Sequence, residues 1–226
     1  MPLEPVSTQD LHVPAHNEER EAINQLNEIM KTRIGLPPSA AYGDLLWFDG
    51  TNWMTTETRF LEGSGRPETK VAGPVGSRYV NKNPDDGGVL WVKTSGGDST
   101  TGWVCVAGNT GLRDIKNQIA LRNTGVANVA YLSRVGNTVE LYVDMKMPNN
   151  TSSPYTIYTL PLGFRPQHNL HGGLTDNKEG ADTGGTAVLT NGSVYIYNPV
   201  AGKSDRYRGT WQTVEAWPAN LPGSPG

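Results

Sequence analysis

The chain lacks features that several functional classes require. It has one cysteine among 226 residues, which excludes an internal disulfide, and the apolar neighbours of Cys105 predict a small buried side chain rather than a reactive thiol. Charge is nearly balanced, at 19 basic and 22 acidic residues. Because no run of Lys or Arg occurs, we do not expect a nucleic-acid partner.

Long apolar stretches are also missing. No segment approaches the roughly 20 apolar residues of a membrane-spanning helix, and the first residues have neither the basic nor the apolar region of a signal peptide. We therefore expect no membrane association and synthesis in a cytoplasm. Residues 60–70 lack the spacing of a phosphate-binding loop, so we expect a surface connection there and no cofactor.

Glycine and proline are abundant, at 27 and 16 residues, which predicts many turns and little helix. The clearest element is a β-hairpin over residues 131–143, because Gly136-Asn137 suits a two-residue turn with positive φ. Val135 should then pair with Thr138. Counting outward gives one mostly apolar face and one mixed face. The expected core pairs are Ala130 with Val143, Leu132 with Leu141 and Arg134 with Val139; the opposite face should pair Tyr131 with Tyr142 and Ser133 with Glu140.

Further strands are expected at close spacing along the rest of the chain. The patterns predict two short strands around Asp49-Gly50, a three-stranded meander within residues 73–114 with Trp91 and Trp103 in its core, and a second hairpin turning at Asn191-Gly192. A strand over residues 156–160 should continue the first hairpin, and one over residues 209–214 should close the sheet. These strands favour a C-terminal sandwich or barrel-like domain.

One helix is expected, over residues 14–33. Glutamates crowd its first turns and Gly35 follows its end, as the helix dipole and C-terminal capping favour. Its apolar stripe must be buried, either on its own domain or in a parallel bundle of three copies. The stripe residues are Ile23, Leu26, Ile29 and Met30.

Taken together, these patterns predict a mainly β protein with a short N-terminal α-helix, which is trimeric if the stripe is buried in the bundle. We expect an N-terminal segment with the helix over residues 1–37, a small β-meander domain over 38–116 and an antiparallel β-sandwich over 117–226.

Several motifs resemble the minor tail and fibre proteins of tailed bacteriophages that infect actinobacteria. The motifs are V-G-S-R-Y-V, V-L-W-V-K-T, T-G-W-V-C-V-A-G-N-T-G-L-R-D-I, L-P-L-G-F-R-P, D-N-K-E-G-A-D and T-W-Q-T-V-E-A-W-P-A-N-L-P-G. The resemblance implies a homotrimeric virion protein, attached to other tail or capsid proteins through its N-terminal part, with its C-terminal domain facing the host surface. A capsid-surface decoration fibre is the alternative within this class.

A receptor-binding role would use aromatic side chains beside polar ones, since aromatic faces cover sugar C–H groups and polar groups fix the hydroxyls. Tyr195 and Tyr197 should face away from the aliphatic residues between them, either to solvent or into the trimer interface. The candidate residues for host-surface glycan binding are His168, Asn169, His171, Asp176, Asn177, Tyr195, Tyr197 and Trp211.

Metal binding and catalysis are weaker interpretations of the same region. His168 and His171 are three residues apart and would point to opposite faces of a strand, and the run 176–182 lacks the calcium-loop spacing. Glu179 and Asp182 could serve a polysaccharide-degrading enzyme as an acid/base pair, although solvated loop carboxylates are the simpler reading. We therefore expect no metal site and no enzyme.

Overall fold

The computed structural model describes residues 21, 25, 44–48, 51–122, 124–148, 154–176 and 182–226. Within them the protein is mainly β and its sheets are antiparallel, as the sequence predicts. The helical positions are Glu21, Gln25 and a short 3-10 turn, η1 (Lys116–Gln118). The four residues of the predicted helical stripe, Ile23, Leu26, Ile29 and Met30, lie outside the described residues, so the helical seam stays a prediction.

The chain divides into two compact units, residues 1–60 and residues 61–226. In the first unit, β1 (Asp44–Phe48) pairs antiparallel with β2 (Trp53–Gly63). Phe48 lies opposite Trp53, which confirms the two strands predicted around Asp49-Gly50. The expectation of a surface connection from residue 60 is wrong at its start, because β2, whose three threonines favour extended backbone, continues to Gly63.

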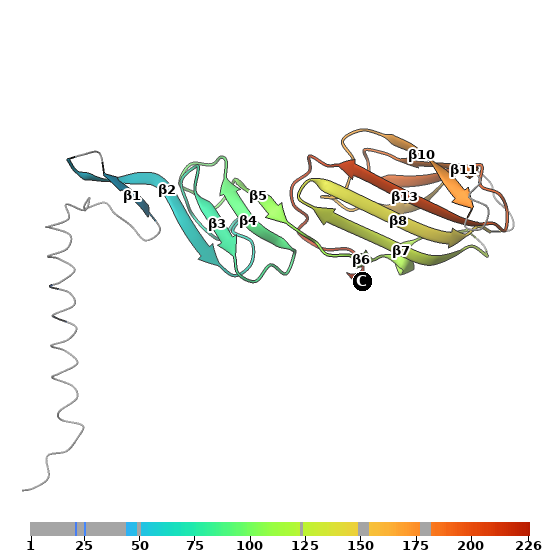
Figure 1. The fold of residues 1–226 in the computed structure, drawn as a ribbon, viewed down its shortest axis with the longest axis horizontal. Helices are drawn as coiled ribbons and strands as arrows, with labels where there is room; N and C mark the ends of the chain where they lie inside the picture. Colours follow the sequence, from blue (N-terminus) through green and yellow to red (C-terminus); the bar gives the residue numbers. More distant parts are fainter. Residues whose placement is uncertain are drawn as a thin grey trace, which may run out of the picture. The chain divides into compact units, whose positions relative to one another are not determined.

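The second unit opens with the predicted meander (Figure 1). Its strands are β3 (Arg78–Asn81), β4 (Gly88–Lys93) and β5 (Trp103–Gly108), each paired with the next. Trp91 and Trp103 are buried together with Tyr79, as expected of core residues. The fourth buried aromatic residue of this small core, Trp217, comes from the C-terminal end of the chain.

The rest of the second unit is one curled antiparallel sheet. Its strand order is β14-β6-β7-β8-β13-β10-β11-β12-β9, and the buried side chains of β7 and β8 share one core with those of β9 and β12. This arrangement is β-sandwich-like. The strands are β6 (Arg113–Asp114), β7 (Val126–Val135), β8 (Thr138–Lys146), β9 (Tyr155–Thr159), β10 (Leu170–Asp176), β11 (Asp182–Val188), β12 (Ser193–Tyr197), β13 (Ser204–Gln212) and β14 (Ser224–Pro225).

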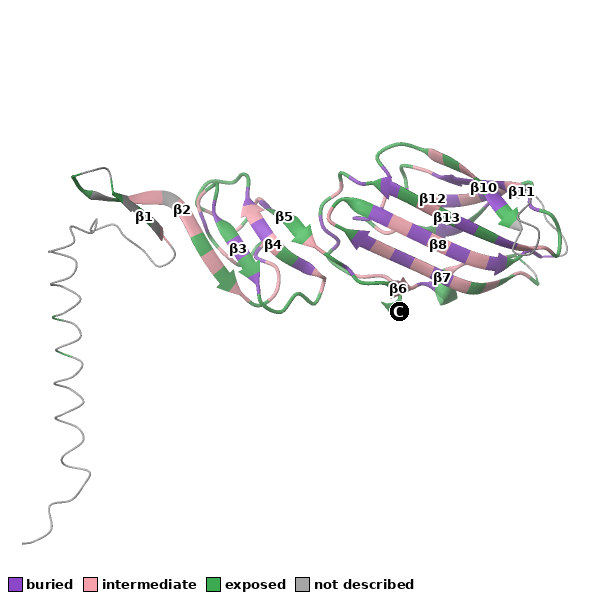
Figure 2. Cartoon of the chain, viewed as in Figure 1, coloured by how far each residue is buried: buried purple, intermediate pink, exposed green. Residues whose placement is uncertain are grey.

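The hairpin β7–β8 has the register predicted from its turn. Val135 pairs with Thr138, and all five further pairs expected over residues 130–143 are present. Buried and less buried residues alternate along both strands (Figure 2), because successive side chains of a strand point to opposite faces. The core face includes one charged residue, Arg134, which is only 2% exposed.

Two strands lie elsewhere in the sheet than the sequence suggests. β13 is not a closing strand: it lies between β8 and β10 in the middle of the sheet. β9 does not continue the first hairpin but pairs with β12, the second strand of the hairpin that turns at Asn191-Gly192. Both pairings join segments far apart in the chain, which local patterns do not specify.

No helix among the described residues is long and apolar enough to cross a bilayer.

Candidate functional site

Part of the surface predicted for glycan binding comes together on the outer face of β10, β11 and β12. His171 lies opposite Ala187, and Ala187 lies opposite Tyr195, so the three share one row across the strands. His171 is exposed and Tyr195 is partly buried. Val194 and Ile196 are fully buried on the other face, which confirms the alternation predicted for this strand.

The next row of the same face contains two glycines. Gly173 lies opposite Gly185, and Gly185 lies opposite Tyr197. The ring of Tyr197 rests directly on Gly185, since a Cβ at that position would collide with the ring. The Tyr197 side chain therefore lies close to the Gly185 backbone and is only partly exposed.

The remaining predicted residues are dispersed. His168 and Asn169 are exposed in the segment before β10, and the Asn169 side chain accepts a hydrogen bond from the Thr190 amide at 2.9 Å. Asp176 is the last residue of β10. Asn177 lies outside the described residues.

Trp211, one of the predicted binding residues, has a position that excludes a surface role. Its side chain is 5% exposed, and its indole N–H donates to the backbone carbonyl of Phe164 at 2.9 Å. The prediction fails because β13 is a central strand, whose inward positions are covered by the core. Trp211 is a core residue.

The structure shows no metal centre in the part of the chain that it describes, and the predicted acid/base pair lies partly outside that part. Among those residues, no three His, Cys, Asp or Glu side chains are placed to hold a metal ion. Glu179 lies outside the described residues, and Asp182 is the first residue of β11.

Cys105 differs in part from expectation. The residue is only partly buried, although its thiol donates to the Ala107 carbonyl at 3.3 Å. Desolvation raises the pKa of the Cys105 thiol to about 11, with the nearby Asp86 carboxylate adding to the shift. A raised pKa leaves little of the nucleophilic thiolate near neutral pH, so low reactivity of Cys105 stays a prediction, now for a reason other than full burial.

A hollow that the sequence did not reveal lies on the outer face of β7, β8 and β13. We call it the tyrosine hollow; its volume is about 240 Å³. Tyr131 and Tyr142 are a cross-strand pair, and Tyr142 also lies opposite Arg208. The ε nitrogen of Arg208 donates to Glu140 at 2.6 Å. The lining residues are Leu112, Tyr131, Ser133, Glu140, Tyr142 and Arg208.

The sequence predicts four of the six residues of this hollow. The predicted hairpin register already places Tyr131 beside Tyr142 and Ser133 beside Glu140 on one face. The two residues that it does not place there are Leu112 and Arg208, and β13 brings Arg208 alongside β8 over a separation of 68 residues from Glu140. No periodicity within either strand indicates that pairing.

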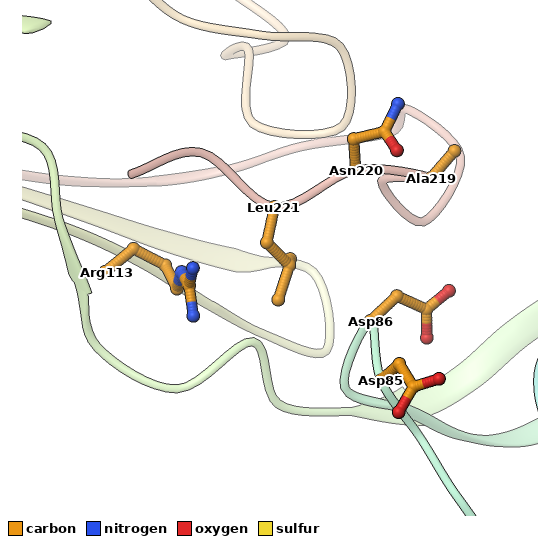
Figure 3. A pocket seen from close by; sticks show the side chains of 6 residues that line it. All are labelled: Asp85, Asp86, Arg113, Ala219, Asn220 and Leu221. Carbon is orange, nitrogen blue, oxygen red and sulfur yellow. The ribbon is translucent and has the colours of Figure 1, made fainter. Parts of the chain in front are cut away.

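A second pocket, of about 310 Å³, lies beside the turn before β4 (Figure 3). Asp85 and Asp86 approach it from the meander, and Arg113 and Leu221 from the C-terminal part of the chain. Two of its three charged side chains, Asp86 and Arg113, are already engaged in the fold. Asp86 accepts a hydrogen bond from the Gly88 amide at 2.9 Å, and the Arg113 ε nitrogen donates to the Pro222 carbonyl at 3.0 Å. We therefore interpret this pocket as part of the structural contact between the meander and the C-terminal sheet, and we call this contact the seam.

The same seam contains the buried charge of β7. Arg134 donates to the carbonyls of Gly136, Gly163, Glu215 and Ala216, and its guanidinium lies 4.9 Å from the ring centroid of Trp217. Burial lowers the pKa of Arg134. The four carbonyls replace the water that the guanidinium gives up, which is what a buried charge requires.

No protein-family model matches the chain, and no curated protein matches it.

Proposed function

We propose that the chain is a non-enzymatic structural protein of a tailed-phage virion. It is a minor tail or fibre protein whose C-terminal β-sandwich attaches to a glycan on the host surface. Its N-terminal segment joins it to other virion proteins, and the helical stripe assembles three copies.

The observation that carries the attachment role is the outer face of the C-terminal sheet. Two tyrosine-bearing areas lie there, one around Tyr195 and Tyr197 on β12 and one around Tyr131 and Tyr142 on β7 and β8. All four tyrosines are partly exposed. Rigid aromatic side chains next to polar groups are the equipment that binds hydroxylated ligands.

The resembling motifs support a structural role, because their residues hold backbone in place. In L-P-L-G-F-R-P, the Gly163 amide donates to the Glu215 carboxylate at 2.6 Å, and the Phe164 carbonyl accepts from Trp211. The motif T-W-Q-T-V-E-A-W-P, near the C-terminal end of the chain, contains Trp211, Glu215 and Trp217. The two motifs bind each other, so their spacing in the sequence serves the fold rather than a reaction.

The test is to label intact particles of the encoding phage with an antibody to this chain and to image them. Label at the tail end is expected, together with saturable adsorption of the purified full chain to host cells. Label spread over the head would replace this proposal with a capsid decoration fibre. Release of reducing sugar from host envelope, lost in Glu179→Gln, would contradict the non-enzymatic assignment.

The trimer has its own measurement. The full chain should have a solution mass of three copies, and Ile23→Asp with Leu26→Asp should lower that mass. The matched control is Gln25→Asp, because Gln25 is helical and exposed. A folded monomer in the unsubstituted protein would refute the bundle.

A further inference from the structure

We propose that the tyrosine hollow is a binding site for a neutral sugar that presents two adjacent hydroxyl groups. The inference rests on the proposed attachment function and names its ligand class. It places the contact on β7, β8 and β13, away from the residues that the sequence singled out on β10 to β12.

The polar part of the hollow is an ion pair, which supplies one positive and one negative group. Arg208 and Glu140 are joined at 2.6 Å, with side-chain exposures of 71% and 38%. A guanidinium has five N–H donors and a carboxylate has two oxygens, and the bond from the ε nitrogen to one oxygen engages one of each. The pair therefore offers a donor and an acceptor side by side to a ligand.

Neighbouring hydroxyls of a sugar match that arrangement, because each hydroxyl both donates and accepts. A phosphate or carboxylate does not match it. Such an anion would gain from Arg208 but would be repelled by Glu140, and an anion site is normally built from unpaired arginine.

The apolar part of the hollow suits the C–H face of a ring. Tyr131 and Tyr142 stand opposite each other on adjacent strands, and Leu112, 49% exposed, adds an aliphatic wall. An aromatic pair on the rigid centre of a sheet offers contact area without a large loss of side-chain entropy on binding.

The size of the hollow favours a small ligand over a second protein chain. Its volume of about 240 Å³ is below the roughly 300 Å³ at which pockets for drug-sized molecules begin. A stable protein–protein interface involves about 20–30 residues on each side, whereas six residues line this hollow. One sugar ring is the appropriate scale.

The experiment is ligand-observed saturation-transfer NMR on the full chain with galactose, mannose, glucose and arabinose, and with glucuronate as the anionic comparison. At least one neutral sugar is expected to bind. Arg208→Gln should weaken that binding about tenfold, the scale of one hydrogen bond to a charged group. Tyr142→Ala should weaken it about two- to tenfold, because it removes an aromatic contact. Phe60→Ala is the control, since it removes an exposed aromatic side chain from β2, outside the C-terminal sheet, and should leave binding unchanged.

The inference is overturned by no transfer to any neutral sugar, by preference for glucuronate, or by equal loss in Phe60→Ala. A lower solution mass in Tyr142→Ala would also overturn it, because the hollow would then be an interface between copies. Arg208→Gln is the safer variant for folding, as its side chain is largely exposed. If particles carry the chain on the tail and Arg208→Gln adsorbs like the unsubstituted protein, this inference fails while the attachment function stands.

Discussion

The guanidinium of Arg134 lies over the indole ring of Trp217, 4.9 Å from the ring centroid. The indole N–H of the same tryptophan donates to the Asp86 carbonyl at 2.9 Å. Asp86 in turn pairs with Arg66, which lies over Trp91 in the meander core. A continuous chain of contacts therefore connects the hairpin β7–β8 to the meander through Trp217.

Arg134→Ala tests the centre of this seam. The substitution leaves four backbone carbonyls without their donor, and we expect a loss of about 3–5 kcal/mol in the free energy of unfolding, as for other broken buried charge networks. Denaturant unfolding measures the loss. Arg134→Lys should also destabilise, since an ammonium cannot reproduce the planar fork of donors.

The matched control is Arg208→Ala, which removes an arginine from the exposed face. We expect a change of no more than about 1 kcal/mol there, the range of exposed ion pairs. Equal losses in the two variants would show that the buried contacts of Arg134 are not what stabilises the fold.

Trp217→Phe and Trp211→Phe form a second matched pair. Each loses one indole N–H bond to a backbone carbonyl, at Asp86 and Phe164 respectively, at a cost of about 1–3 kcal/mol for the carbonyl left unsatisfied. Their locations differ. Amide hydrogen exchange should rise in the meander for Trp217→Phe and in the C-terminal sheet for Trp211→Phe, and the reverse pattern would contradict the assigned contacts.

Local pattern predicted the elements, but long-range pairing decided their places. The register of β7–β8 followed from the turn at Gly136-Asn137, because a two-residue loop and a period of two leave no freedom. The strand around Trp211 was also recognised. Its central position was not, because only pairing with β8 and β10 determines it, and the prediction of a surface Trp211 failed for that reason.

The candidate site also has a part that local pattern predicts and a part that depends on long-range pairing. Tyr195 and Tyr197 were expected on one face, and that follows from alternation within a single strand. Their approach to His171 depends on the pairing of β10 with β11, which the spacing of the histidines does not indicate. For the same reason, the sequence does not predict that Glu140 pairs with Arg208 or that Trp217 joins the core of the meander.

Gly163 is expected to tolerate no side chain. Its φ is +94°, and a Cβ there would lie 2.8 Å from the Cβ of Pro218, so Gly163→Ala adds steric overlap to backbone strain. We expect a loss of about 2–4 kcal/mol, more than the roughly 1–2 kcal/mol for left-handed backbone alone. Gly111→Ala isolates the strain, because φ is +67° and nothing lies within 4 Å. Similar losses in Gly163→Ala and Gly111→Ala, measured by thermal unfolding, would mean that the structure around Gly163 relaxes to accept the added methyl group.

Alkaline pH should destabilise the fold through Tyr158. Desolvation raises the pKa of this buried phenol from 10.0 to about 12, so the neutral form is favoured in the folded state. Below pH 10 the phenol is neutral in both states and has no effect. Between pH 10 and 12 the unfolded chain loses the proton first, and stability falls as pH rises.

Tyr158→Phe removes that titration and one hydrogen bond, from the phenol to the Gln118 side chain at 3.1 Å. We expect the free energy of unfolding to fall less steeply between pH 10 and 12 in the variant than in the unsubstituted chain. Denaturant titrations at stepped pH measure both slopes. Parallel slopes would show that the phenol ionises as readily in the folded state as in the unfolded chain.

Cys105 should react slowly despite its partial exposure. A pKa of about 11, raised first by desolvation and then by Asp86, lowers the thiolate fraction at pH 8 by about 100-fold relative to an ordinary thiol two pKa units lower. Because the thiolate is the nucleophile, alkylation by iodoacetamide at pH 8 should be slower than in the denatured chain by a similar factor. Asp86→Asn should recover a small part of the rate, since it removes the repelling charge but not the desolvation. Equal rates in the folded and denatured protein would show that the Cys105 thiol is solvated, and the rate in Asp86→Asn would separate the effect of charge from that of burial.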